Sequence, residues 1–236
     1  MADRNLLLFL YICHVLGDFY LQTNDMSQKK RGNLSFTLYH SVYYGIPFLG
    51  LLLLDIRLIV IVVLAVGVHG LIDLLKCRVE KMMVKNPRRK PRITEIQVFV
   101  LDQALHFATI YLIVRTLNHK EIGISVYVLA WVLSLLILLK PANISFKILF
   151  SRFAPNENEP VSILGAGAVI GSLERILMLL FLVLGQYASV GLIMTAKSIA
   201  RYDRISKDPV FAEYYLIGTL YSVLLTLVVF SMAFLM

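Results

Sequence analysis

Charged residues and cysteines are both scarce in this sequence. Only 16% of the 236 residues are charged, whereas a soluble globular domain has about 25%. There are two cysteines, Cys13 and Cys77, and each lies in or beside an apolar run. Two such cysteines form no disulfide framework, so both are expected to be reduced. The low charge content excludes an ordinary soluble domain.

The sequence also lacks the features of a cleavable leader. Its first apolar run, Leu6 to Leu21, has neither the basic region nor the small-residue cleavage site of a secretory signal. We therefore expect this run to be a permanent membrane span.

Apolar residues, in contrast, are abundant and fall into long runs. They make up 58% of the chain, against about 45–50% in soluble domains. A membrane-spanning helix needs about 20 predominantly apolar residues. The pattern predicts an all-α, polytopic transmembrane helix bundle of seven to eight spans, of which 189–202 is the shortest. The predicted segments are 5–22, 36–54, 57–76, 95–117, 124–140, 162–187, 189–202 and 212–235.

The net charge of +8 is distributed over short loops between the apolar runs. The largest basic group includes Arg88-Arg89-Lys90, between the third and fourth segments, and further Lys and Arg residues follow the first, fifth and seventh. These loops share one side of the membrane if both termini face outward, and the positive-inside rule makes that side cytoplasmic. The distribution favours contact with anionic lipid headgroups over nucleic-acid binding.

Histidine and aspartate recur four residues apart inside three of the apolar runs, and a further histidine lies near the start of a fourth. The spacing of four puts both side chains of a pair on one helix face. At about 1.5 Å per residue, all seven groups fall in one layer of the cytoplasmic leaflet. They are His14 with Asp18, His69 with Asp73, Asp102 with His106, and the single His40.

Ionisable groups inside a span cost roughly 2.5–3.5 kcal/mol each and therefore need partners. Histidine nitrogen and carboxylate oxygen are common ligands of zinc and of other divalent transition metals. Seven groups exceed one tetrahedral site, so either two ions bind or some groups orient the true ligands. The alternative is a hydrogen-bonded or proton-relay network without metal. The expected ligands are Asp18, His69, Asp73, Asp102 and His106, with His14 and His40 as further ligands or general bases.

Charged side chains also occur within the apolar segments of the second half of the chain. Arginine and lysine suit phosphate oxygens, and cations facing a metal centre are what phosphoester hydrolysis needs. The alternative is that these residues only tie helices together. The candidate substrate-binding residues are Glu174, Arg175, Lys197, Arg201 and Glu213.

These motifs resemble an uncharacterised bacterial integral-membrane family, the domain of unknown function 3307. The matching pieces are His14 to Gln22, His69 to Asp73, Gly171 to Arg175, Ala196 to Arg201 and Ala212 to Leu220. The resemblance implies a multi-pass protein of the bacterial cytoplasmic membrane and carries no established activity. We expect one transmembrane domain over 1–236, with a His/Asp half at 1–118 and a Glu/Arg/Lys half at 124–236.

Three functions remain open from the sequence. The leading hypothesis is a metal-dependent hydrolase of a lipid-like or phosphate-bearing substrate reached from the inner leaflet. The second is a divalent-cation transporter that uses the same His/Asp site, although transporter sites usually lie near the midplane between repeats and no repeat is detected. The third, a membrane scaffold, leaves seven costly groups unexplained.

Overall fold

The computed structural model describes residues 2–30, 32–85, 95–119, 121–154 and 165–235. Across these ranges every regular element is helical, and six helical stretches are long and apolar enough to cross a membrane. The prediction of an all-α, multi-pass membrane protein is therefore confirmed. The six stretches are Leu34–Leu54, Ile56–Lys81, Glu95–Thr116, Val126–Leu149, Ala166–Val183 and Pro209–Leu235.

Two of the predicted spans are helical but are not among these six. The predicted span 5–22 is helix α1 (Ala2–Val15), which runs directly into a π-helical turn, η1 (Leu16–Tyr20). The predicted span 189–202 is helix α9 (Tyr187–Ala200), with 14 residues. At about 1.5 Å per residue it reaches about 21 Å, less than the ~30 Å hydrocarbon core of a bilayer.

The predicted span 124–140 is longer in the structure than in the prediction. It consists of α6 (Val126–Leu138) and α7 (Lys140–Leu149), separated only by Leu139. Leu139 departs from helical geometry, with φ −86° and ψ −100°, and Pro141 follows in the first turn of α7. Proline is tolerated there because the first turn of a helix has no acceptor for its backbone nitrogen.

Two predictions concern parts of the chain outside the described residues. The basic group Arg88-Arg89-Lys90 lies there entirely. The predicted span 162–187 lies there only at its start, and helix α8 (Ala166–Val183) makes up most of its described part, ending before the turn at 184–186.

Contacts within the chain divide it into two compact units, Met1–Leu133 and Ser134–Met236. The boundary falls inside α6. Each unit contains fully buried apolar side chains, such as Leu10 in the first and Leu179 in the second. Each therefore has a core of its own.

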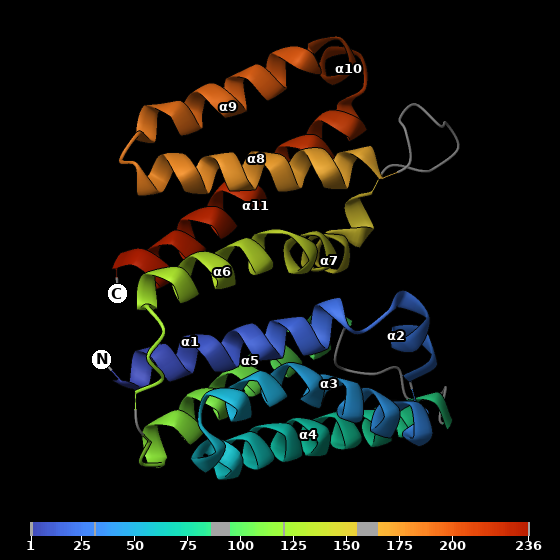
Figure 1. The fold of residues 1–236 in the computed structure, drawn as a ribbon. Coiled ribbons are helices and arrows are strands. Elements are labelled where there is room, and N and C mark those ends of the chain that lie inside the picture. Colours follow the sequence, from blue (N-terminus) through green and yellow to red (C-terminus); the bar gives the residue numbers. More distant parts are fainter. Residues whose placement is uncertain (1, 31, 86–94, 120, 155–164, 236) are drawn as a thin grey trace. The chain divides into compact units, whose positions relative to one another are not determined.

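Four helices of the first unit surround a common interior. They are α1, α3 (Leu34–Leu54), α4 (Ile59–Lys85) and α5 (Glu95–Thr116). Helix α3 packs on α4, α4 on α5, α5 on α1 and α1 on α3, so the four form a closed ring (Figure 1). The short α2 (Asn24–Lys30) packs on α3 beside one end of this ring.

Two polar residues define where α3 begins and ends. The side chain of Asn33 accepts hydrogen bonds from the backbone nitrogens of Ser35 and Phe36, and so caps the start of α3. Asp55 follows the end of α3, and its carboxylate accepts from the backbone nitrogen of Arg57 at 3.0 Å. Because the same residue closes α3 and opens the 3-10 turn η2 (Ile56–Leu58), the connection to α4 is tight and the two helices are antiparallel.

Gly17 allows α1 to approach α3 closely. A Cβ atom at this position would lie 2.6 Å from Cδ2 of Tyr44 and 3.0 Å from its backbone oxygen. Any side chain at residue 17 would therefore push the two helices apart. Gly17 belongs to the π-helical turn η1, an irregularity that is frequent at functional sites.

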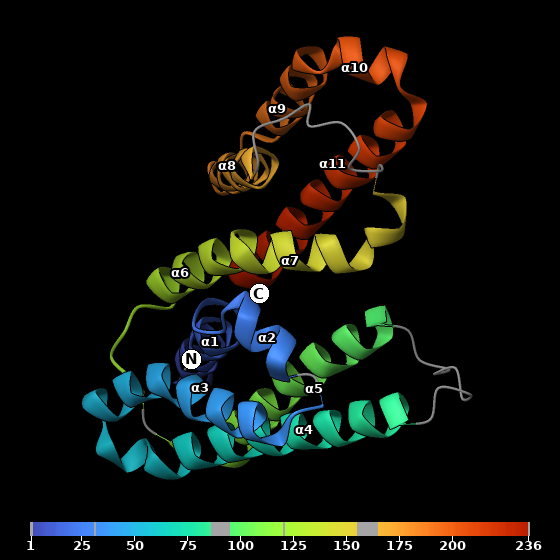
Figure 2. The same ribbon diagram turned by 90° about the vertical axis from the view of Figure 1, so that its right-hand side faces the viewer.

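The second unit is built mainly on α8, α9 and α11 (Pro209–Phe230). Helix α11 packs on α8 and on α7, and α8 packs on α9. The short α10 (Tyr202–Lys207) turns the chain from α9 into α11 (Figure 2). The remaining short elements are the 3-10 turn η3 (Ser151–Phe153) and the π-helical turn η4 (Ser231–Leu235).

Candidate metal centre

The predicted histidines and aspartates of the first half meet in the interior of the four-helix ring. The four histidines are at most 2% exposed, and Asp73 and Asp102 are 1% and 8% exposed. The ring centroids of His69 and His106 are 4.2 Å apart, and that of His14 is 5.3 Å from His106. Four helices therefore bring these groups into one cluster: His14 and Asp18 from α1 and η1, His40 from α3, His69 and Asp73 from α4, and Asp102 and His106 from α5.

Two overlapping sets of three residues in this cluster could hold a metal ion. One set is Asp18, His40 and His69, and the other is His69, Asp73 and His106. Within each set the possible ligand atoms lie within 4.8 Å of one another. His69 belongs to both, and the second set is the more deeply buried.

The imidazoles of His69 and His106 are the strongest structural sign of a ligand. Among the described residues, neither ring nitrogen of either histidine has a hydrogen-bond partner, although both side chains are buried. Leaving a buried polar group without a partner costs about 1–3 kcal/mol. An ion bound between these groups would remove that cost at the one nitrogen that each imidazole offers to it.

The distances around these imidazoles suit shared ligation. Nε2 of His69 lies 3.4 Å from Oδ2 of Asp73, and Nε2 of His106 lies 3.6 Å from Oδ1 of Asp102 and 4.0 Å from Oδ1 of Asp73. Two ligands bound at about 2.0–2.2 Å to one tetrahedral ion are about 3.4 Å apart. The geometry therefore fits ligands of a common cation better than it fits direct hydrogen bonds.

His14 is engaged on both of its ring nitrogens. Its Nδ1 lies 3.2 Å from the Tyr44 hydroxyl and its Nε2 lies 3.3 Å from Oε1 of Gln103. The Gln103 amide nitrogen donates to Oδ2 of Asp18 at 2.8 Å. Because the amide oxygen then faces Nε2 of His14, that nitrogen carries the proton and Nδ1 accepts from Tyr44. His14 thus orients Gln103, which in turn orients Asp18.

Tyr44 and Gln103 are components of the cluster that the sequence analysis missed. The ring of Tyr44 stacks on that of His69, with centroids 3.4 Å apart and parallel planes. Gln103 directly follows Asp102 in α5, so it lies off the face defined by the four-residue spacing. A signal was present, since Gln103 is a polar amide within an apolar segment.

Two lysines also reach into the cluster, although the charge pattern assigned both to loops. Nζ of Lys30 lies 2.5 Å from Oδ2 of Asp73, and Nζ of Lys76 lies 2.8 Å from Oδ2 of Asp102. Their side chains are 12% and 28% exposed, so they are more accessible than the histidines. Lysine stems are long enough to lie along apolar surface while the ammonium group finds a polar partner.

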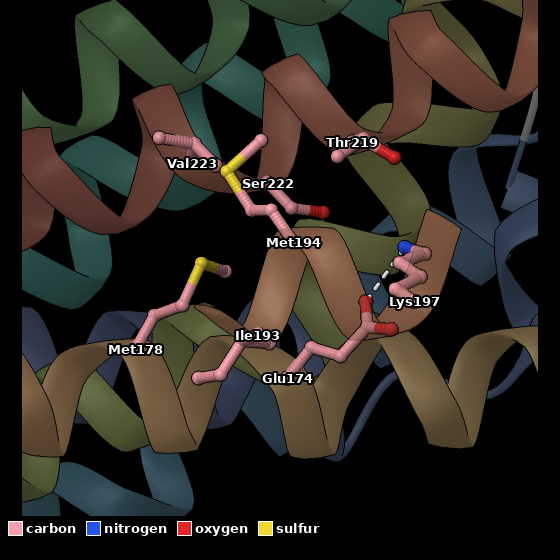
Figure 3. A pocket seen from close by; sticks show the side chains of 8 residues that line it. All are labelled: Glu174, Met178, Ile193, Met194, Lys197, Thr219, Ser222 and Val223. Atoms are coloured by element: carbon pink, nitrogen blue, oxygen red, sulfur yellow. Dashed lines mark hydrogen bonds and ion pairs between the residues drawn. The ribbon is translucent and has the colours of Figure 1, made fainter. Parts of the chain in front are cut away.

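The five candidate substrate-binding residues all belong to the second unit, and two of them form a close ion pair. Nζ of Lys197 lies 2.6 Å from Oε2 of Glu174, at a crevice between α8, α9 and α11 (Figure 3). The same ammonium group lies 5.4 Å from the ring centroid of Tyr215. Arg201 follows the end of α9, and Glu213 is exposed on α11.

Arg175 is buried and well supplied with acceptors. Its Nε donates to the backbone oxygen of Leu138 at 2.7 Å, and its Nη2 donates to Oδ1 of Asn143 at 2.7 Å. Longer bonds reach the hydroxyls of Ser172 and Ser222. These contacts join α8 to α6, α7 and α11. A substrate-binding role for this set stays a prediction.

Comparison with known proteins identifies one family. A family model described as a protein of unknown function (DUF3307) matches residues 6–149. The matched range contains every histidine and aspartate of the cluster as well as both lysines. No curated protein and no solved structure shows a significant match.

Proposed function

The chain belongs to that family, and since the family brings no activity with it, we propose from the site itself that the protein is a metal-dependent membrane hydrolase. Its substrate would be lipid-like or phosphate-bearing. The observation that supports this is the pair of buried imidazoles, His69 and His106, which lack hydrogen-bond partners among the described residues and each lie near a different oxygen of Asp73.

In this proposal His69, Asp73 and His106 hold a divalent transition metal, zinc in preference to others. Catalytic zinc sites commonly use three protein ligands of this kind and keep a fourth position for water or substrate. Oδ1 of Asp102 lies near the same His106 nitrogen and either completes the coordination or orients His106.

A bound metal ion would polarise a phosphoryl or carbonyl oxygen and generate a nucleophile from water at neutral pH. Other residues of the cluster would take up the proton that the attacking water releases. Nε2 of His40 lies 3.2 Å from Oδ1 of Asp18, and Gln103 fixes the second oxygen of that carboxylate. With Nε2 of His40 donating to Asp18, its Nδ1, which has no hydrogen-bond partner among the described residues, would accept the proton of the attacking water, and Asp18 would orient the imidazole. His14 would act through Gln103 and Asp18.

The position of the cluster supports access from the inner leaflet. His14 and Asp18 lie at the end of α1, and His40 lies in the second turn of α3, on the side where α2 packs. The positive-inside rule assigns this side to the cytoplasm, because the basic loops attach there. We therefore propose a bacterial cytoplasmic-membrane protein with both termini outside.

One observation favours the alternative, a divalent-cation transporter. The two possible ligand sets share His69, so a single ion could occupy them in turn as it moves along the interior. A transporter would show metal flux into sealed proteoliposomes that depends on Asp102. A hydrolase would turn over a phosphoester or lipid substrate without such flux.

Elemental analysis of detergent-purified protein tests the metal centre. We expect about one zinc ion per chain from a three-ligand catalytic site and its loss in an Asp73→Asn variant. Asp25→Asn is the matched control, because Asp25 lies on α2 with its side chain 70% exposed and pairs with Lys29 on the neighbouring turn, outside the cluster. Equal metal content in wild type and Asp73→Asn would reject the proposed centre.

A further inference from the structure

We propose that Lys30 and Lys76 form an anion-binding clamp at the metal centre, and that it receives the phosphate group of the substrate. This inference rests on the proposed function and assigns the anion-binding role to residues of the first unit. Each lysine is held by a carboxylate of the cluster and borders the outside of the bundle.

Lys30 and the proposed metal ion would use the same carboxylate oxygen. Oδ2 of Asp73 lies 2.5 Å from Nζ of Lys30, 3.4 Å from Nε2 of His69 and 3.6 Å from Nε2 of His40. A divalent ion held by His69, His106 and Asp73 would therefore weaken the attraction between Asp73 and Lys30. The ammonium group at the end of α2 would then be available to a new anionic partner.

Lys76 binds its carboxylate in a different way. It pairs with Oδ2 of Asp102, whereas Oδ1 has no hydrogen-bond partner among the described residues and faces His106. One oxygen thus serves the lysine and the other faces the proposed ion. Lys76 can remain beside the centre while the ion is bound.

The charges of the cluster favour an anionic ligand once the metal ion is present. With neutral imidazoles, the aspartates Asp18, Asp73 and Asp102 outweigh the two lysines by one negative charge. A divalent ion changes this balance to one positive charge. Phosphate suits such a site because ammonium groups and a metal ion can each bind a different oxygen.

The exposure of the side chains indicates that a ligand meets the lysines before it meets the imidazoles. The lysine side chains are 12% and 28% exposed, whereas those of His69 and His106 are 2% and 1% exposed. A lysine that served only to neutralise a carboxylate would influence anion binding only through its screened charge, and therefore by less than a direct charge-assisted contact. That difference makes the two roles separable.

The test uses the full-length protein in detergent, loaded with Co²⁺, whose visible absorption reports on its ligands. Inorganic phosphate is titrated into wild type, Lys30→Met and Lys76→Met. We expect phosphate to perturb the spectrum of wild type and each substitution to weaken its binding by about tenfold or more, which corresponds to about 1.4 kcal/mol. Lys30→Arg keeps the positive charge and is expected to retain phosphate binding.

Lys29→Met is the matched control. Lys29 precedes Lys30 in α2, but its side chain is 52% exposed and pairs with Asp25 at 2.7 Å. Its substitution is expected to leave phosphate binding unchanged. Equal phosphate affinity in Lys29→Met and in both lysine-cluster variants would overturn the clamp.

Two further results show whether the metal centre or only the clamp has failed, and whether the ligand is a lipid headgroup or a free phosphate. Absence of cobalt binding by wild type would overturn the proposed metal centre itself, whereas cobalt binding with no effect of phosphate would overturn only the clamp. A second titration replaces inorganic phosphate with short-chain phosphatidic acid in the same micelles. Tighter binding of the lipid supports the clamp and identifies a headgroup as its ligand, and tighter binding of the free ion supports it with a water-soluble substrate.

Discussion

The two units differ in how completely the buried ionisable side chains of their apolar helices are partnered. In the second unit Arg175 has close acceptors for its guanidinium, and Glu174 is paired with Lys197 at 2.6 Å. In the first unit the imidazoles of His69 and His106 lack hydrogen-bond partners among the described residues. The comparison teaches that a buried charge is not by itself the sign of a site. The sign is a cluster of buried ionisable groups in which several ring nitrogens are left without a partner.

Among the substitutions that test this comparison, we expect the largest effect from His69→Phe, on metal binding. We expect His69→Phe to weaken metal binding by roughly 70- to 900-fold, because about 10–16 kcal/mol shared among four ligands is about 2.5–4 kcal/mol each. The stability of chelator-treated protein should stay equal or rise by about 1 kcal/mol, since an apolar ring replaces unpaired nitrogens. Metal titration and thermal unfolding measure the two effects. A large loss of stability after chelation would break the comparison.

A substitution at Arg175 should have the opposite pattern, with a loss of stability and no loss of metal binding. We expect Arg175→Met to destabilise the protein by about 2–3 kcal/mol, because the carbonyl of Leu138 and the amide oxygen of Asn143 lose a charged donor. Metal content per folded chain should not change. Thermal unfolding and elemental analysis of the same preparation check both statements. Loss of metal at Arg175→Met would show that the second unit contributes to the centre.

Gln103 offers a smaller test within the first unit. Gln103→Leu removes the donor to Asp18 and the acceptor of His14 while keeping a similar side-chain volume. We expect activity to fall about 10- to 100-fold, the usual loss when a residue that orients the reacting groups of a metal site is removed. The rate of phosphoester hydrolysis by Gln103→Leu, compared with that of wild type, measures this effect. An unchanged rate would remove Gln103 and His14 from the proposed mechanism.

The smallest effect is expected at Glu174. Glu174→Gln weakens one partly exposed ion pair with Lys197, whose side chains are 14% and 21% exposed. Such pairs contribute about 0–1 kcal/mol, so the unfolding temperature should fall only slightly and phosphate binding should not change. Weaker phosphate binding in this variant would instead support the substrate-binding role expected from the sequence.

The sequence was sufficient for the helical class and for the gathering of the His/Asp groups. Apolar runs of membrane-spanning length predicted the helices, and the spacing of four in His69/Asp73 and Asp102/His106 predicted a shared face. What it missed depends on tertiary contacts. Lys30 follows the first apolar run and Lys76 is the last residue of the third, so both were counted with the basic loops, whereas their long stems carry the ammonium groups back to the carboxylates.

Other features leave no trace in the length of apolar runs or in the spacing of ionisable residues. The acceptors of Arg175 include the carbonyl of Leu138, and a backbone oxygen cannot be recognised from residue type. The helical break at Leu139 was missed because the apolar run ends at almost the same point. Helix α2, with seven residues, is too short and too polar for the apolar pattern to predict.

The position of Tyr44 affects how single substitutions at His14 and His69 must be interpreted. Its ring lies flat against His69 while its hydroxyl donates to His14, so a single phenol holds two imidazoles from different helices. Replacing either histidine also disturbs the Tyr44 contact that positions the other. The effect measured for a single variant will therefore overstate the separate contribution of the replaced histidine. Only combinations, including Tyr44→Phe, which keeps the ring and removes the hydroxyl, can divide the effect between stacking and hydrogen bonding.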